Sequence, residues 1–113
     1  MLELLYYPRG TYGPVAVYLE QLAKEQPKAF AKLAIDLEVL GAEGLRSSRI
    51  TIRPMGKKLW ELKRLYEGVQ YRIFFGIWKG AAWLLHSIEK KSAQTPNEDL
   101  ELARKRLREV VSS

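Results

Sequence analysis

The chain has 113 residues, 47% of them hydrophobic, which suits one globular domain with a single core and is too short for two. The absence of cysteine excludes disulfides, thiolate metal sites and a cysteine nucleophile, and no stretch approaches the ~18 apolar residues that a membrane span needs. The net charge of +6 comes from residues 46–113, which contain 15 Lys or Arg and seven Asp or Glu. Residues 1–45 contain four Lys or Arg and six Asp or Glu. A basic half of this kind is typical of proteins that bind a polyanion, most often nucleic acid, and equally of a surface that only keeps a protein in solution.

The N-terminal part predicts a strand followed by two helices, at the start of a single domain that spans residues 1–113. Residues 2–7 form a short apolar run closed by Pro8 and the glycines after it. Apolar residues then recur at helical spacing from Pro14 to Gln26, and again from Pro27 until Gly41 or Gly44. These stripes indicate core contacts in a helical hairpin. The chain begins without a basic leader, so we expect a soluble, cytoplasmic protein.

Three runs in the second half predict strands, because they are rich in β-branched and aromatic residues and are separated by turn signals. They are KLWELKRLY (58–66), QYRIFFGIW (70–78) and AAWLLHSI (81–88), with Glu67-Gly68 and Lys79-Gly80 between them, and at most a short strand at 49–53 precedes them. Such an order favours an antiparallel meander. Alternation places Arg72 on the face of Phe74 and Trp78, and leaves a more apolar face for the helices.

The last helix is predicted to begin at a T-x-x-E capping box, with Thr95 as the N-cap, Pro96 at the first helical position and Glu98 three residues after the cap. The basic run RKRLR at 104–108 predicts a solvated helix face, or one that helps to hold nucleic acid. The fold class is therefore α+β. We expect an N-terminal strand and a helical hairpin packed on a twisted antiparallel sheet, with a C-terminal helix.

The motifs of several enzyme classes are absent. The chain has no phosphate-binding loop, no dinucleotide fingerprint and no nucleophile elbow, and its one histidine, His86, cannot build a His-rich metal site. What remains is a set of basic residues at strand positions, a pattern that suits RNA cleavage without metal or cofactor. Such cleavage needs a base for the 2′-hydroxyl proton, positive charge for the phosphorane and an acid for the departing 5′-oxygen.

Five short motifs occur in an order that resembles a known family. They are LWELK (59–63), YRIFF (71–75), LLH (84–86), KKSAQTP (90–96) and ELARKR (101–106). The order is similar to that of the phage-derived HigB-like branch of the RelE/ParE toxin superfamily, over about residues 45–110. The resemblance implies a small RelE-like fold and the toxin of a type II toxin–antitoxin system, an endoribonuclease that cleaves mRNA on the ribosome and so blocks translation. It implies three partners, namely mRNA, the ribosome and a cognate helix-turn-helix antitoxin in a hetero-oligomer, and no cofactor.

The resemblance also implies site residues. Arg72, the arginine of the strand motif, would hold the scissile phosphate, and Lys90 with Lys91 would stabilise its charge or act as the acid. Lys57 and Lys58 lie where relatives carry basic catalytic residues. His86 is a further catalytic candidate, because histidine exchanges protons near neutral pH. Further RNA contacts are expected from Lys63, Arg64, Arg53 and Arg49.

The chain departs from the family pattern in ways that leave the general base open. Lys63 replaces the arginine of LWELR, and the neighbouring Arg64 would point to the opposite strand face. The catalytic tyrosine that some relatives carry near the C-terminus has no counterpart, because Tyr71 is the last tyrosine. Glu61 is expected to pair with Lys63.

The alternation of His86 with Leu84 and Ile88 favours a core histidine, hydrogen-bonded to backbone, over a catalytic one. The three tryptophans are likewise expected to pack rather than to stack on bases.

Two other functions fit the same pattern. A ParE-like member would inhibit DNA gyrase and leave RNA intact, and a DNA-damage response instead of blocked translation would identify it. A non-enzymatic, nucleic-acid-binding phage accessory protein would only grip phosphates, so alanine substitutions would weaken binding in a graded, salt-dependent way.

Overall fold

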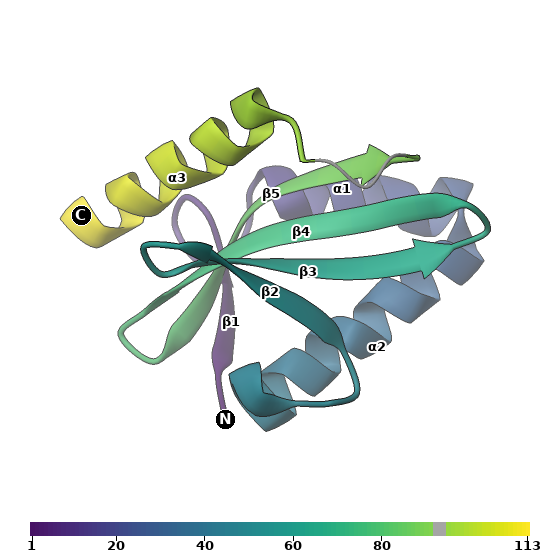
Figure 1. Cartoon of the computed structure of the whole chain (residues 1–113), viewed down its shortest axis with the longest axis horizontal. Helices are drawn as coiled ribbons and strands as arrows, with labels where there is room; N and C mark the ends of the chain where they lie inside the picture. The colour runs from purple at the N-terminus through teal and green to yellow at the C-terminus, as the bar shows by residue number, and fades with distance from the viewer. Residues whose placement is uncertain (92–94) are drawn as a thin grey trace.

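The computed structural model describes residues 1–91 and 95–113 and shows one five-stranded mixed sheet between two layers of helices (Figure 1). The strands are β1 (Glu3–Tyr6), β2 (Thr51–Gly56), β3 (Leu59–Tyr66), β4 (Val69–Trp78) and β5 (Ala81–Lys90), in the order β1-β5-β4-β3-β2. The helices are α1 (Pro14–Glu25), α2 (Pro27–Glu43) and α3 (Asn97–Ser112), with a short 3-10 turn at Gly44–Arg46. The predicted α+β architecture is confirmed.

The strands β2 to β5 form the predicted antiparallel meander, and β1 adds to its edge as a strand parallel to β5. The short strand expected at 49–53 is instead Thr51–Gly56. Periodicity could not reveal it, because its exposed edge position leaves only a weak apolar alternation.

The α1–α2 hairpin covers one face of the sheet and forms the larger core (Figure 1). Leu19 of α1 and Leu33 and Leu40 of α2 are buried against Ile73 and Phe75 of β4. These are the residues of the predicted helical stripes, which explains why the N-terminal part could be assigned from spacing alone.

The opposite face of the sheet is only partly covered, by α3. Leu107 and Val110 of this helix pack on Phe74 and Leu85. A Cβ built on Gly76 of β4 would lie 2.3 Å from Leu107 Cδ1, so the helix approaches the strand where the strand carries no side chain. Beyond the start of α3, polar side chains lie on this side of the sheet, and two of them, Glu61 and Arg72, are buried.

A β-bulge in β5 sets which of its residues face α3. Phe74 pairs with His86 whereas Phe75 pairs with Leu84, so Leu85 is the extra residue. The Leu85 carbonyl accepts a hydrogen bond from Arg106 Nη1 at 2.7 Å. The extra residue of the bulge is thus hydrogen-bonded to α3.

The predicted start of the last helix is one residue too early. The helix begins at Asn97, its N-cap position is Pro96, and no side chain caps it. Thr95 is therefore not the N-cap, and its hydroxyl bonds to side chains of the sheet instead. Across the described residues, no helix has the length and apolar character to cross a bilayer.

Candidate nucleic-acid interface

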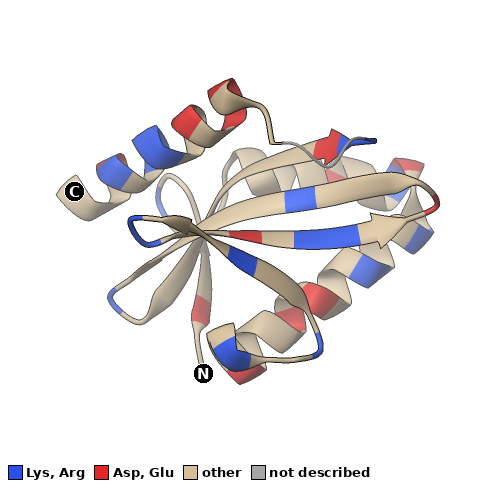
Figure 2. Ribbon diagram, in the orientation of Figure 1, with Lys and Arg blue, Asp and Glu red and all other residues tan. Residues whose placement is uncertain are grey.

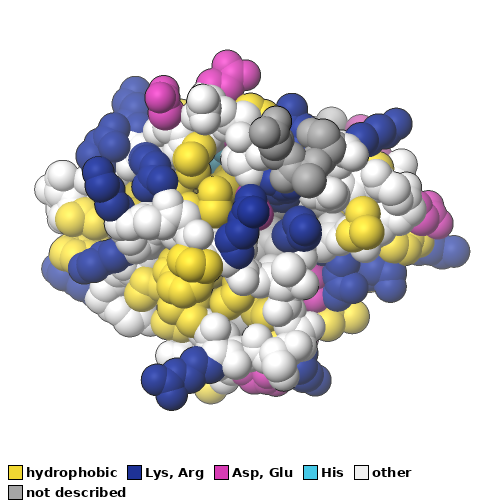
Figure 3. All heavy atoms as spheres, in the orientation of Figure 1, with side chains coloured by type: hydrophobic (Ala, Val, Ile, Leu, Met, Phe, Trp, Pro, Cys, Tyr) yellow, Lys and Arg dark blue, Asp and Glu magenta, His cyan; other side chains and the backbone are white. Residues whose placement is uncertain are grey.

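The strand register brings four of the predicted site residues onto one face of the sheet, the face that also carries α3. Figure 2 shows basic positions along the strands β2 to β5. Lys63 of β3 lies opposite Arg72 of β4, and Lys90 of β5 lies opposite Gln70, two residues along β4. Arg53 of β2 joins the same face, since it lies opposite Glu61. In space-filling view, basic side chains gather on this face over α3 and across the strands (Figure 3).

Arg72 projects from β4 on this face and is buried, with 1% of its surface exposed. Its Nη1 is 3.3 Å from Oε2 of Glu61, which is 2% exposed, and donates to Thr95 Oγ1 at 2.5 Å. Its Nη2 donates to Gln70 Oε1. Arg72 is therefore held by its neighbours, Thr95 among them, and is not offered to solvent.

Glu61 contacts Arg72, Arg53 and Thr95. It pairs with Arg72 and with Arg53, whose Nε is 3.3 Å from Oε1, and it accepts a hydrogen bond of 3.0 Å from Thr95. The expected pairing with Lys63 is wrong, because Arg53 faces Glu61 across the β2–β3 register and Arg72 lies diagonally on β4. Arg53 is half exposed, so the buried part of this group is the pair of Glu61 and Arg72.

His86 shares the face of Ile88 but not that of Leu84, because the bulge at Leu85 reverses the alternation. Its ring stacks on Phe74 with centroids 6.1 Å apart, and its Nε2 lies 2.7 Å from Asp99 Oδ1 near the start of α3. The expected backbone partner is therefore wrong, and a carboxylate takes its place. This pair ties α3 to β5.

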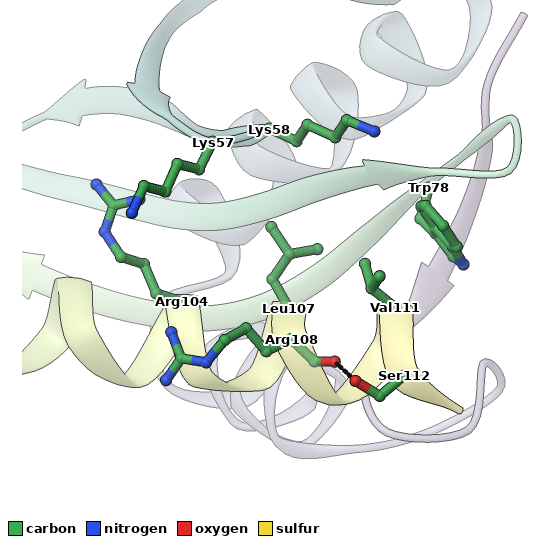
Figure 4. Close-up of a pocket in the computed structure, with 8 residues that line it drawn as sticks. All are labelled: Lys57, Lys58, Trp78, Arg104, Leu107, Arg108, Val111 and Ser112. Carbon is green, nitrogen blue, oxygen red and sulfur yellow. Dashed lines mark hydrogen bonds between the residues drawn. The ribbon is translucent and has the colours of Figure 1, made fainter.

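Lys57 and Lys58 form the exposed turn between β2 and β3, away from Arg72 and beside the C-terminal half of α3 (Figure 4). Together with that helix they border a hollow of about 400 Å³. Its lining residues are Lys57, Lys58, Trp78, Arg104, Leu107, Arg108, Val111 and Ser112. Arg104 holds the turn in place, since its guanidinium donates to the carbonyls of Met55 and Gly56 at 2.5 and 3.2 Å.

Arg64 and Arg49 do not join these residues. Arg64 points to the helical-hairpin face, as expected, where Nε and Nη2 donate to Asp36 of α2 at 2.8 and 2.5 Å. The hydrogen bonds to Asp36 raise the pKa of Arg64 above its ordinary value. Arg49 pairs with Glu43 at 2.8 Å. Lys91 is exposed just after β5.

The sequence model of one family, the phage-derived Gp49-like proteins (DUF891), matches residues 16–108. The chain belongs to this Gp49-like family. Gp49-like proteins are associated with toxin–antitoxin systems. A comparison with curated proteins finds no match.

In this Gp49-like protein, the sequence missed several residues that complete the basic face. The sequence predicts Thr95 only as a helix cap and Trp78 only as a packing residue, and it gives no signal for Asp99 as the partner of His86. Arg104 and Arg108 belonged to a basic run with two readings, and only their spacing of four residues, one helical turn, put them on the same side of α3. Among residues 1–91 and 95–113, no group of three or more His, Cys, Asp or Glu side chains could hold a metal ion.

Proposed function

We propose that this Gp49-like protein is the toxin of a type II toxin–antitoxin pair and that it cleaves mRNA on the ribosome without a metal ion. The observation that carries the proposal is the basic face between the β2–β3 turn and the end of β5. Exposed or half-buried lysines from three places in the sequence, Lys57 and Lys58, Lys63, and Lys90 and Lys91, lie around the side of the sheet that carries α3. Single-stranded RNA is the polyanion that such a face fits.

The step needs a base, an acid and positive charge at the phosphate. The 2′-oxygen attacks the neighbouring phosphorus as its proton passes to a base, the P–O5′ bond breaks, and the leaving oxygen receives a proton from an acid. The products are a 2′,3′-cyclic phosphate and a free 5′-hydroxyl. Lys63 on β3 and Lys90 on β5 flank Arg72 on β4, and their charge would stabilise the phosphorane between them.

Arg72 has a specific part in this proposal. Its guanidinium is neutralised by Glu61 and shielded by Thr95, so exposed lysines make the first contact with the RNA backbone. Arg72 comes into contact with the scissile phosphate once the Thr95 hydroxyl has been displaced. Until then the buried pair links β4 to β3, the strand that carries Lys63.

The antitoxin completes the system. An acidic segment of a helix-turn-helix antitoxin would cover the basic face and so compete with RNA for the same lysines. This competition accounts for inhibition without a separate regulatory site.

The test adds the purified protein to a translating extract that contains a defined mRNA and maps new 5′ ends by primer extension. Cuts at discrete in-frame positions, absent without ribosomes, are expected. The variant Lys63→Ala/Lys90→Ala should lose them, because it removes two cations that flank the scissile phosphate. The matched control Lys24→Ala/Lys28→Ala removes two exposed lysines from the helical hairpin and should cut like the wild type.

Intact mRNA with a folded wild-type protein would refute the proposal. Inhibition of DNA supercoiling by purified gyrase would then identify the ParE-like alternative. RNA binding without cuts would identify an accessory protein that only grips phosphates.

A further inference from the structure

The hollow between the β2–β3 turn and the C-terminal half of α3 has no assigned role, and we propose that it binds one nucleotide of an RNA strand. Its volume of about 400 Å³ lies in the range of small-molecule sites. This inference rests on the proposed function, because it names a place where the RNA substrate is held away from Arg72.

The two ends of the hollow differ in character (Figure 4). Lys57, Arg104 and Arg108 lie toward one end, and none of the eight lining residues carries a carboxylate. Leu107 lies between the ends, and Val111 lies beside Trp78 at the other. Cations at one end and an apolar, aromatic wall at the other match the phosphate and the base of a single nucleotide.

The lysines of the turn adopt a backbone conformation that lysine disfavours. Lys57 and Lys58 have φ of 52° and 68°, both in the left-handed region. The other two tight turns of the sheet place glycine at the second position, Gly68 and Gly80, with φ of 79° and 75°. Adjacent like charges on a strained two-residue turn oppose stability, and such strain is found where a binding function requires the side chains.

Contacts around the hollow hold its walls in place. The Arg104 guanidinium bonds the turn to α3, and the ammonium groups of Lys58 and Lys79 lie 5.5 and 5.7 Å from the centre of the Trp78 ring. Positive charge therefore rims the aromatic wall as well.

Strand β2 leads from the turn beside the hollow toward the rest of the basic face. Arg53 precedes Lys57 by four residues on the strand that leads to the turn, a span of ~13 Å in extended chain. A strand of RNA that runs along β2 would meet Arg53 on its way from the hollow toward Lys63. A compact hollow at the end of such a track suits a flanking nucleotide better than an extended acidic peptide.

The experiment measures binding of a fluorescein-labelled RNA octamer by anisotropy, without ribosomes. Arg108→Gln should weaken binding about tenfold. It should also make the slope of log affinity against log salt concentration shallower, by the contribution of about one phosphate contact. Lys105→Gln is the matched control, because it removes the same charge from an exposed position of α3 that does not line the hollow. Val111→Ser should weaken binding and leave the salt dependence unchanged, since it alters only the apolar wall.

A second readout locates the ligand. Titration with a nucleoside monophosphate should shift the indole N–H signal of Trp78, assigned by its loss in Trp78→Phe, and inorganic phosphate should shift it far less. Equal losses in Arg108→Gln and Lys105→Gln, or an unmoved Trp78 signal, would overturn the proposal. Displacement of the RNA by a peptide of alternating Glu and Leu at lower concentration than by unlabelled RNA would assign the hollow to a protein partner instead.

These outcomes remain distinct from those of the ribosome assay. If mRNA is cut equally well by wild type and Arg108→Gln, the hollow is not a substrate site and the proposed function stands. If mRNA stays intact while the octamer binds through the hollow, the proposed function fails and the nucleotide site stands.

Discussion

Arg72 and Glu61 form a buried ion pair across β4 and β3, with 3.3 Å between Nη1 and Oε2 and with 1% and 2% of the two residues exposed. An ion pair this deep must be kept intact, because removal of one partner leaves an uncompensated charge in the interior. The arginine that the family resemblance assigns to the scissile phosphate is thus also part of the protein's framework.

Arg72→Ala is expected to destabilise the fold by about 3–5 kcal/mol, because it removes the buried partner of the Glu61 carboxylate and leaves the half-exposed Arg53 and the Thr95 hydroxyl beside it. Urea denaturation followed by tryptophan fluorescence measures the loss. Loss of toxicity in this variant would therefore not by itself identify a catalytic role.

The double variant Arg72→Met/Glu61→Leu separates the two roles. Replacement of both charges by apolar groups should restore most of the stability. If this folded protein no longer cuts mRNA, Arg72 acts on the substrate. If it cuts like the wild type, the role of Arg72 is confined to the framework.

Lys58→Gly should stabilise the protein by about 1 kcal/mol, because glycine adopts the φ of 68° at that position without strain. The same change should weaken RNA binding, since it removes one cation from the hollow.

Gly68→Ala is the control, because it makes the reverse change, from glycine to a residue with a side chain, in a turn away from the hollow. A Cβ at Gly68 has nothing within 4 Å, so this variant should lose about 1 kcal/mol through its φ of 79° alone and bind RNA normally. A Lys58→Gly protein that is less stable than the wild type would contradict the argument from strain.

Asp99→Asn is expected to loosen the start of α3, because it weakens the 2.7 Å contact to Nε2 of His86. Hydrogen–deuterium exchange should rise in the first turn of α3 while the α1–α2 hairpin stays protected. His86→Phe keeps the stacking on Phe74 and removes the same contact, so it should reproduce the effect. If the His86→Phe protein also stops cutting mRNA at unchanged stability, His86 has a catalytic role after all.

The Tyr18 hydroxyl gives the protein an alkaline limit. Burial first, and then its hydrogen bond to Glu89, raise the pKa of Tyr18 above its ordinary value. The unfolded chain releases the tyrosine proton from about pH 10, whereas the folded protein retains it. The contribution to stability is therefore complete below pH 10 and is lost as the pH rises further.

Tyr18→Phe should consequently flatten the fall in stability above pH 10, at a cost of ~1 kcal/mol at neutral pH for the lost hydrogen bond. Thermal unfolding between pH 7 and 11 measures both effects. Tyr12→Phe is the control, because it removes an exposed hydroxyl that donates to Glu20. It should change the stability at neutral pH and the fall in stability above pH 10 by less than Tyr18→Phe does.

The sequence by itself determined most of the elements. Apolar spacing gave the two helices of the hairpin within a residue or two, and the turn pairs Glu67-Gly68 and Lys79-Gly80 gave the order of β3 to β5. These features depend on local chemistry: a helix shows its buried stripe every third or fourth residue, and a tight turn needs residues that tolerate positive φ.

Only the tertiary structure decided which charges are available to a ligand. Arg64, Arg72 and Arg106 appear equivalent to Lys57 in a count of charge, yet each is bonded to a partner distant in sequence. The single extra residue at Leu85 also reversed the face of His86, which no periodicity could show. Alternation and charge follow from neighbours along the chain, whereas burial and pairing follow from neighbours in space, and the latter decide which cations can meet a phosphate.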